Sequence, residues 1–181
     1  MTPGTLRRAW AKLVDTPAAI GVAAAMAVAG WQASTVVVNY QGDYTALFCT
    51  GDSWVLPPEL DKTTYRFAGS VGYDGQFYRL VARDPWLAAG YSQYVDSAAV
   101  RWRRILAPAV AWALAAGASE RIDFTYILVL LICHGLGAYA LSRWLVLRGR
   151  HPAGGLLFLL FPGTLICIDR LTVDVALYTL L

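Results

Sequence analysis

The stretch PAAIGVAAAMAVAGWQASTVVV, residues 17–38, contains no charged side chain and decides the fold class. As an α-helix it would reach about 33 Å, enough to cross the roughly 30 Å hydrocarbon core of a bilayer. A second run, residues 124–146, would reach about 34 Å and is interrupted only by His134 and by Arg143 near its end. Two runs of this length predict transmembrane helices.

Two further apolar runs follow the second one. Residues 153–168 would reach about 24 Å as a helix, with Pro162 and Gly163 near their end. Another run opens at Val175 and is cut off at Leu181. We therefore expect an all-α, polytopic transmembrane helix bundle, and we expect residues 1–181 to be the N-terminal part of a longer protein.

The composition agrees with this class and excludes others. The chain is 57% hydrophobic and 15% charged, with a mean hydropathy of +0.48. A net charge of +3, scattered along the chain, does not favour nucleic-acid binding. Cys133 and Cys167 sit in apolar runs, where a thiol behaves as a small hydrophobe. We expect no disulfide and no cysteine metal cluster, with Cys49 as the third thiol.

Basic residues predict the topology. One cluster precedes the first span and another follows the second, and the positive-inside bias places both in the cytoplasm. Residues 105–118 would reach only about 21 Å as a helix. If they crossed the membrane, the second cluster would fall outside, so we favour an interfacial position, with a crossing as the alternative. The clusters are Arg7, Arg8 and Lys12, and Arg143, Arg148 and Arg150.

Residues 39–123 form one long loop on the outer side in this topology. Nearly all the acidic residues lie in it or in a second short outer segment, and only Asp15 is cytoplasmic. Chemistry that needs carboxylates is therefore expected outside. The first run continues well past residues 27–29, a passable cleavage site, so it reads as a retained signal anchor rather than a signal peptide.

Two helices are predicted within the outer loop. Residues 72–85 have apolar and polar side chains on opposite faces, with Asp74 at the N-cap position and Pro85 after the end, as in a helix lying on the membrane. A second helix is expected over 101–118, with arginines crowded at its start and Trp102 as an interfacial anchor. Cations there oppose the helix dipole, so they need an anionic partner, either a lipid headgroup or a ligand phosphate.

Five motifs carry a family resemblance: Tyr73–Tyr78 (YDGQFY), Arg103–Pro108 (RRILAP), Arg148–Arg150 (RGR), Phe161–Gly163 (FPG) and Asp169–Asp174 (DRLTVD). In this order they resemble the start of a bacterial GT-C glycosyltransferase. The pattern is similar to the GPI mannosyltransferases and, more distantly, to the catalytic subunit of oligosaccharyltransferase. In those families an Asp early in the first outer loop precedes a juxtamembrane helix, and a second acidic motif follows a Pro-Gly.

The resemblance implies an enzyme of the bacterial cytoplasmic membrane with its active site on the outer face. It would transfer a hexose, with mannose as a candidate, from a polyprenyl-phosphate donor to a glycan, lipid or protein acceptor, with inversion. Asp74 would be the catalytic base, and Asp174 and Asp169 match the second acidic motif. The acidic pair that binds metal in oligosaccharyltransferase is not reproduced, so a divalent cation is left open and no other cofactor is implied. Donor phosphate or lipid headgroups would be bound by Arg101, Arg103, Arg104 and Arg170.

Other readings of these features remain. Asp74 and Asp174 could each cap a helix, a contribution of about 1 kcal/mol. His134 is expected to be neutral and hydrogen-bonded to a neighbouring helix, and Gly135 with Gly137 predicts close helix packing.

The rival function is a non-catalytic polytopic protein, such as a lipid-linked glycan transporter or an assembly subunit. A transporter should carry ionisable groups near the bilayer midplane, whereas these charges gather at the span ends. A polysaccharide polymerase or ligase is the second enzymatic alternative. The family's later donor-site spans are missing here, so this part alone is expected to be inactive.

Overall fold

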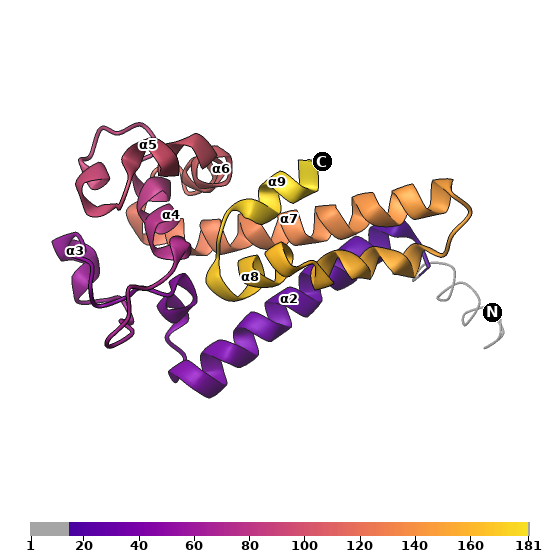
Figure 1. Ribbon diagram of the computed structural model, residues 1–181, viewed down its shortest axis with the longest axis horizontal. Coiled ribbons are helices and arrows are strands. Elements are labelled where there is room, and N and C mark those ends of the chain that lie inside the picture. Colours follow the sequence, from indigo (N-terminus) through magenta and orange to yellow (C-terminus); the bar gives the residue numbers. More distant parts are fainter. Residues whose placement is uncertain (1–14, 181) are drawn as a thin grey trace.

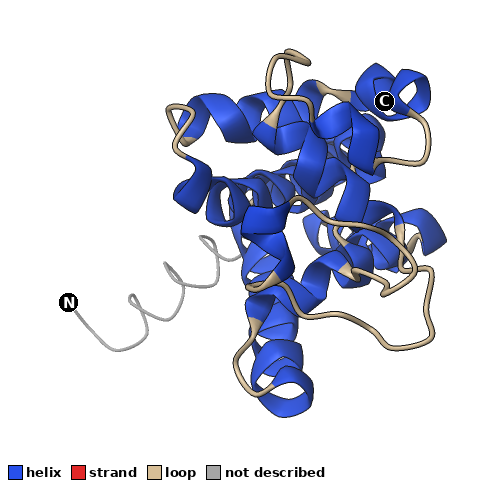
Figure 2. Ribbon diagram, turned by 90° about the vertical axis from the view of Figure 1, so that its left-hand side faces the viewer, coloured by secondary structure: helices blue, strands red, loops and turns tan. Residues whose placement is uncertain are grey.

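The computed structural model describes residues 15–180, and within that range it contains helices and no β-strand (Figures 1 and 2). Two long helices, α2 (Pro17–Tyr40) and α7 (Ser119–Leu147), pack side by side in opposite directions (Figure 1). Both are long and apolar enough to cross a membrane. They match the first two predicted spans.

Local sequence explains where α2 begins and ends. The Thr16 hydroxyl accepts a hydrogen bond from the Ala19 amide at 3.2 Å, and Pro17 follows at the first helical position, where its missing N–H costs nothing. The helix ends at Tyr40, and the next residue, Gln41, has a left-handed φ of 54°. Backbone geometry of this kind stops the α-helical hydrogen-bond ladder.

Small residues bring α2 and α7 close together. A Cβ added at Gly21 would lie 2.8 Å from the Gly135 carbonyl oxygen, and one added at Gly135 would lie 2.9 Å from the Gly21 oxygen. Gly137 leaves room for the ring of Phe158 in the same way. The close packing predicted from Gly135 and Gly137 is confirmed.

The third apolar run is bent. It forms a 3₁₀ helix, η4 (Pro152–Leu160), and then α8 (Pro162–Arg170), with an angle of 67° between them. Pro162 has no N–H and restarts the helix at its first position, which explains the break at this point. Counted as one span, the bent pair would give a third crossing. Helix α9 (Asp174–Leu180) follows, one residue before the predicted start, and packs on α7.

The segment between α2 and α7 gathers at one end of the bundle, called here the loop end (Figure 1). The helix predicted over 72–85 is present as α4. The continuous helix expected over 101–118 is interrupted, because Pro108 cannot donate to the carbonyl four residues earlier and α6 begins only two residues before it. The elements of the segment are η1 (Tyr44–Phe48), α3 (Pro58–Asp61), α4 (Asp74–Arg83), η2 (Tyr91–Tyr94), α5 (Ala98–Arg101), η3 (Trp102–Arg104) and α6 (Leu106–Leu114).

Helix α6 lies across the bundle. Figure 1 shows it almost end-on while α7 runs across the view, so it does not follow the direction of the long helices. Ala107 and Ala111 face the protein and are buried, whereas Leu106, Val110 and Leu114 are exposed. The outward face of α6 is therefore apolar.

The opposite end of the bundle carries the second basic cluster. The start of α2 and the end of α7 meet there (Figure 1), and Asp15 Oδ1 lies 3.9 Å from His151 Nε2. Arg148 and Arg150 flank the turn into η4. The first basic cluster, residues 7–12, lies outside the described residues.

Helix α4 differs from its prediction in one respect. The polar face expected to point to water is buried, and every residue from Gly75 to Ala82 is buried. Arg79 and Arg83 point instead at Asp123, which lies inside α7 rather than in the loop. The helix therefore packs into the end of the bundle on both faces, and its description as a helix with one solvated face is wrong.

Candidate functional site

The first acidic motif lies at the loop end, where α4 begins. Asp74 is the first residue of α4, and the N-cap position belongs to Tyr73, without a side-chain capping bond. The N-cap reading of Asp74 is therefore wrong, because its carboxylate does not cap the helix. The Asp74 side chain is 40% exposed. It is a carboxylate at the surface rather than a part of the core.

Arg101 holds one oxygen of this carboxylate. Its Nη1 lies 2.7 Å from Asp74 Oδ2, while its Nε and Nη2 donate to the two oxygens of Asp96 at 2.8 and 2.7 Å. The guanidinium group is only 8% exposed and lies over the rings of Phe77 and Tyr78, at 4.6 and 5.4 Å from their centroids. All three of its nitrogens are engaged, so Arg101 fixes the position of Asp74.

The electrostatics of this contact favour the charged forms. Burial opposes the charge on Arg101, but its hydrogen bonds to the carboxylates of Asp96 and Asp74 outweigh burial and raise the pKa of the guanidinium. Hydrogen bonds from Arg101 outweigh burial in the same way and lower the pKa of Asp96. The Arg101–Asp96 pair is thus ionised throughout the neutral range.

The second acidic motif reaches the same place through Arg104. Arg104 Nη1 lies 2.7 Å from Asp174 Oδ1, and the two side chains are 49% and 26% exposed. Electrostatic interactions with Tyr78 and Asp174 raise the pKa of Arg104. Tyr78 is fully buried, and within the described range its hydroxyl has no hydrogen-bond partner. We call Asp74, Asp96, Arg101, Arg104, Asp174 and Tyr78 the polar cluster.

The other predicted site residues lie elsewhere. Asp169 accepts a hydrogen bond from Trp31 Nε1 at 3.1 Å, and Arg170 Nη1 donates to Cys49 Sγ at 2.8 Å. Burial raises the pKa of the Cys49 thiol, against the effect of Arg170. Arg103 is exposed and makes no side-chain contact with the described residues. The structure brings together Asp74, Arg101, Arg104 and Asp174, but not these three side chains.

Gly75 positions the start of α4 and was not singled out from the sequence. A Cβ at this position would lie 2.1 Å from the backbone oxygen of Arg170 and 3.2 Å from that of Phe48. Only glycine allows α4 to approach the end of α8 this closely. The contact places Asp74, the preceding residue, next to the segment that carries the second acidic motif.

A buried ion cluster joins the other end of α4 to α7. Asp123 Oδ2 accepts from Arg79 Nη2 at 2.6 Å, and Oδ1 accepts from Arg79 Nε at 3.0 Å and lies 2.6 Å from Arg83 Nη1. Arg79 Nη1 also donates to the Thr64 hydroxyl at 2.7 Å. All three ionised side chains are at most 5% exposed. Removing a partner from such a cluster leaves a buried charge without compensation.

Two carboxylates of the polar cluster, Asp74 and Asp174, each use one oxygen for an arginine, whereas Asp96 uses both. Asp74 Oδ2 and Asp174 Oδ1 are engaged, and Asp74 Oδ1 and Asp174 Oδ2 form no hydrogen bond or ion pair within residues 15–180. Across residues 15–180, no three His, Cys, Asp or Glu side chains are grouped so that they could hold a metal ion. The chemistry available at this place is therefore that of a positioned carboxylate beside guanidinium groups.

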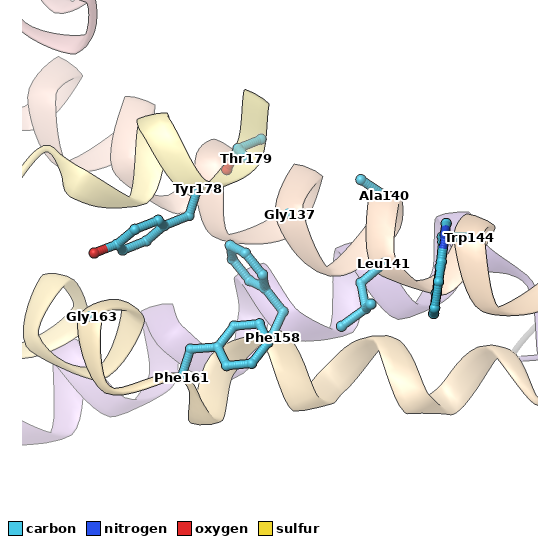
Figure 3. Close-up of a pocket in the computed structure, with 9 residues that line it drawn as sticks. All are labelled: Gly137, Ala140, Leu141, Trp144, Phe158, Phe161, Gly163, Tyr178 and Thr179. Atoms are coloured by element: carbon cyan, nitrogen blue, oxygen red, sulfur yellow. The ribbon is translucent and has the colours of Figure 1, made fainter. Parts of the chain in front are cut away.

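A large apolar cavity lies away from the polar cluster. Its volume is about 730 Å³, and it opens between α7, η4, α8 and α9 (Figure 3). The rings of Phe158 and Phe161 lie together on one wall, and Trp144 lies farther along α7 (Figure 3). The lining is apolar, and no residue of the polar cluster contributes to it.

Comparisons with known proteins give no relative for this chain. No protein-family model matches the chain, and no curated protein or solved structure is significantly similar to it. The arrangement of the residues and the motifs described above therefore provide the basis for a proposed function.

Proposed function

We propose that the chain is the N-terminal part of a GT-C membrane glycosyltransferase that transfers a hexose from a polyprenyl-phosphate carrier to an acceptor on the outer face. The observation that supports this most is the meeting of the two acidic motifs. Asp74 and Asp174 are far apart in sequence, yet Arg101 and Arg104 tie both to one short segment at the loop end. The resemblance assigns these same two aspartates to the active site.

In this proposal Asp74 takes the proton from the attacking hydroxyl of the acceptor. A hydroxyl is a poor nucleophile at neutral pH, and a positioned base contributes a factor of about 10² to 10⁴ in rate. Arg101 holds Asp74 Oδ2 at 2.7 Å, and the partial exposure of the side chain leaves Oδ1 accessible to an acceptor. A base needs this combination of a fixed position and an accessible oxygen.

The leaving group needs no strong acid. A lipid phosphate departs as a stable anion, and nearby cations stabilise the charge that develops on it. The arginine cluster of residues 101–104 supplies such cations at the loop end. One carboxylate and one group of arginines are therefore sufficient for this chemistry.

The proposal also places the molecule in the membrane. Helices α2 and α7 cross it, the end with Arg148 and Arg150 lies in the cytoplasm, and the loop end lies on the outer surface. The exposed apolar face of α6, with Leu106, Val110 and Leu114, then rests in the outer leaflet. A lipid-linked donor would meet the polar cluster at this depth, at the boundary between hydrocarbon and water.

Substitution of Asp74 tests the function. The full-length protein with Asp74→Asn, reconstituted in liposomes, should lose about 10²- to 10⁴-fold in the rate of sugar transfer from a polyprenyl-phosphate donor. Arg101 keeps its two bonds to Asp96 in this variant, so the fold should persist, as the melting temperature will report. Glu120→Gln is the matched control, because this exposed carboxylate near the same end forms no side-chain hydrogen bond or ion pair with residues 15–180. Normal turnover in a folded Asp74→Asn protein would remove Asp74 from the mechanism.

A further inference from the structure

The hydroxyl group of Tyr126 joins α7 to the short turn between α8 and α9. We infer that Tyr126 is a positioning residue for the proposed sugar transfer. Its hydrogen bond to Leu171 fixes the turn, and the turn fixes the place of Asp174. This role rests on the proposed function, which assigns Asp174 to the active site, but the control of the turn by Tyr126 can be measured without any activity.

The turn, residues 171–173, is buried and has an unfavourable backbone conformation. Leu171 has a left-handed φ of 47°, which residues with a Cβ adopt only at an energetic cost. Leu171 is fully buried, and Thr172 and Val173 are at most 4% exposed. A conformation of this kind persists only where the surrounding structure holds it.

Tyr126 holds the turn from another helix. Its hydroxyl donates to the backbone oxygen of Leu171 at 2.8 Å, and both residues are fully buried. A second polar contact, between the Thr172 hydroxyl and Cys167 Sγ at 2.9 Å, joins the turn only to α8, the helix that precedes it. Loss of the Tyr126 hydroxyl would take this hydrogen bond from a buried carbonyl oxygen, which destabilises more than the loss of an exposed one. The place of the turn relative to α7 therefore depends on Tyr126.

The turn leads directly into the second acidic motif. Asp174 is the first residue of α9, and only two residues lie between it and Leu171. From this position Asp174 Oδ1 lies 2.7 Å from Arg104 Nη1. A displacement of the turn would carry the carboxylate with it, and a shift of about 1 Å in an active-site group can lower a rate about 10²-fold.

The same side of α7 anchors the first acidic motif. Asp123 stands three residues before Tyr126, so both side chains lie on one side of the helix. Asp123 binds Arg79 and Arg83 of α4, the helix that begins with Asp74. One turn of α7 thus holds both motifs, through a carboxylate for the first and a hydroxyl group for the second.

Removal of this one hydroxyl group tests the role. Tyr126→Phe keeps the ring, whose centroid lies 5.8 Å from that of Phe48, and removes the bond to Leu171. In liposomes with the full-length protein, kcat for sugar transfer should fall about 10- to 100-fold. Tyr139→Phe is the matched control and should keep the wild-type kcat, because this tyrosine of the same helix forms no hydrogen bond within residues 15–180.

A double-mutant cycle separates positioning from a general loss of stability. Asp174→Asn alone should lower kcat at least as much as Tyr126→Phe does. If Tyr126 acts through Asp174, adding Tyr126→Phe to Asp174→Asn should lower kcat by less than about a further twofold. A wild-type kcat in Asp174→Asn overturns the inference. So does a second loss as large as the one that Tyr126→Phe causes in the wild-type background.

Hydrogen exchange gives a readout that needs no turnover. In Tyr126→Phe the amides of residues 172–178 should exchange about two- to tenfold faster, while those of α2 and α4 keep their wild-type rates. Unchanged exchange at 172–178, or faster exchange throughout the bundle, would overturn the inference. Faster exchange confined to 172–178 in a protein without sugar transfer would keep the link to the turn and remove the proposed function. Transfer that needs Asp74 but is unaffected by Tyr126→Phe would do the reverse.

Discussion

Replacing Asp123 by Asn should detach helix α4 from the bundle. The carboxylate compensates two buried guanidinium groups, with contacts of 2.6 Å to Arg79 Nη2 and 2.6 Å to Arg83 Nη1. Asn has nearly the same size but no charge, so both arginines would remain buried without their counterion. Because α4 begins with Asp74, a loss of this anchoring also loosens the polar cluster.

The burial of the cluster sets the magnitude. Breaking a buried ion pair by removing one partner costs about 3–5 kcal/mol. One kcal/mol corresponds to about 2–4 °C in melting temperature for a chain of this size, so the expected fall is about 6–20 °C. Asp61→Asn provides the contrast, because the Asp61–Arg66 pair is exposed and such a pair contributes about 0–1 kcal/mol. The same chemical change should therefore lower the melting temperature by at most about 4 °C there.

Thermal unfolding of the purified full-length protein in detergent, followed by circular dichroism, measures both variants. Hydrogen exchange of the α4 amides should rise in Asp123→Asn and remain unchanged in Asp61→Asn. Equal melting temperatures for the two variants would show that the Arg79–Asp123–Arg83 cluster does not hold α4, and the reasoning from burial would fail.

Three other predictions concern Gly75, Tyr91 and the topology. Gly75→Ala places a methyl group 2.1 Å from the Arg170 carbonyl oxygen, so both the melting temperature and sugar transfer should fall, whereas Gly30→Ala, with no neighbour within 4 Å, should preserve both. Tyr91 donates a hydrogen bond to Glu59, and burial with this bond raises the pKa of Tyr91 from 10.0 to about 12. Because the pKa of Tyr91 is higher in the folded than in the unfolded protein, its contribution to stability is complete below the unfolded-state pKa and is lost as the pH rises through the folded-state pKa. The difference in melting temperature between wild type and Tyr91→Phe should therefore shrink from pH 10 to 12. A constant difference would contradict this. Cysteines at exposed Gln93 and His151 should react with an impermeant maleimide from opposite sides of the membrane, and labelling from one side would refute the proposed topology.

The long helices could be predicted because hydropathy is a local property. The runs 17–38 and 124–146 correspond to α2 and α7. The first turn of α7 was missed because Asp123 looks unfavourable in an apolar helix. Its compensation comes from Arg79 and Arg83, far away in the sequence, and no local pattern contains that information.

The active-site prediction was limited by the same difficulty. The motifs marked Asp74 and Asp174, but they did not show which arginine binds which carboxylate. Arg101 binds Asp96 and Arg104 binds Asp174, and this pairing depends on the break before α6. Pro108 is the signal that could have predicted that break. Tyr78 was also detectable, since it stands four residues after Asp74 and so shares its helix face.

The polar pattern of α4 gave its bounds but not its surroundings. Alternating faces show that a helix is amphipathic, and they do not show whether the polar face meets water or a buried counterion. Gly75 could have been recognised on energetic grounds, because a glycine inside a helix costs stability unless a close contact requires it. The backbone oxygen of Arg170 provides that contact.

The bend between η4 and α8 carries a consequence for the lipids around the protein. If η4 stands along the membrane normal, its nine residues rise about 18 Å, and α8, turned by 67°, adds only about 5 Å. The pair then falls about 7 Å short of a typical hydrocarbon core. If the bent pair crosses the membrane, this hydrophobic mismatch would thin the bilayer locally, and the lipid headgroups beside it would lie closer to the bilayer centre than those farther away.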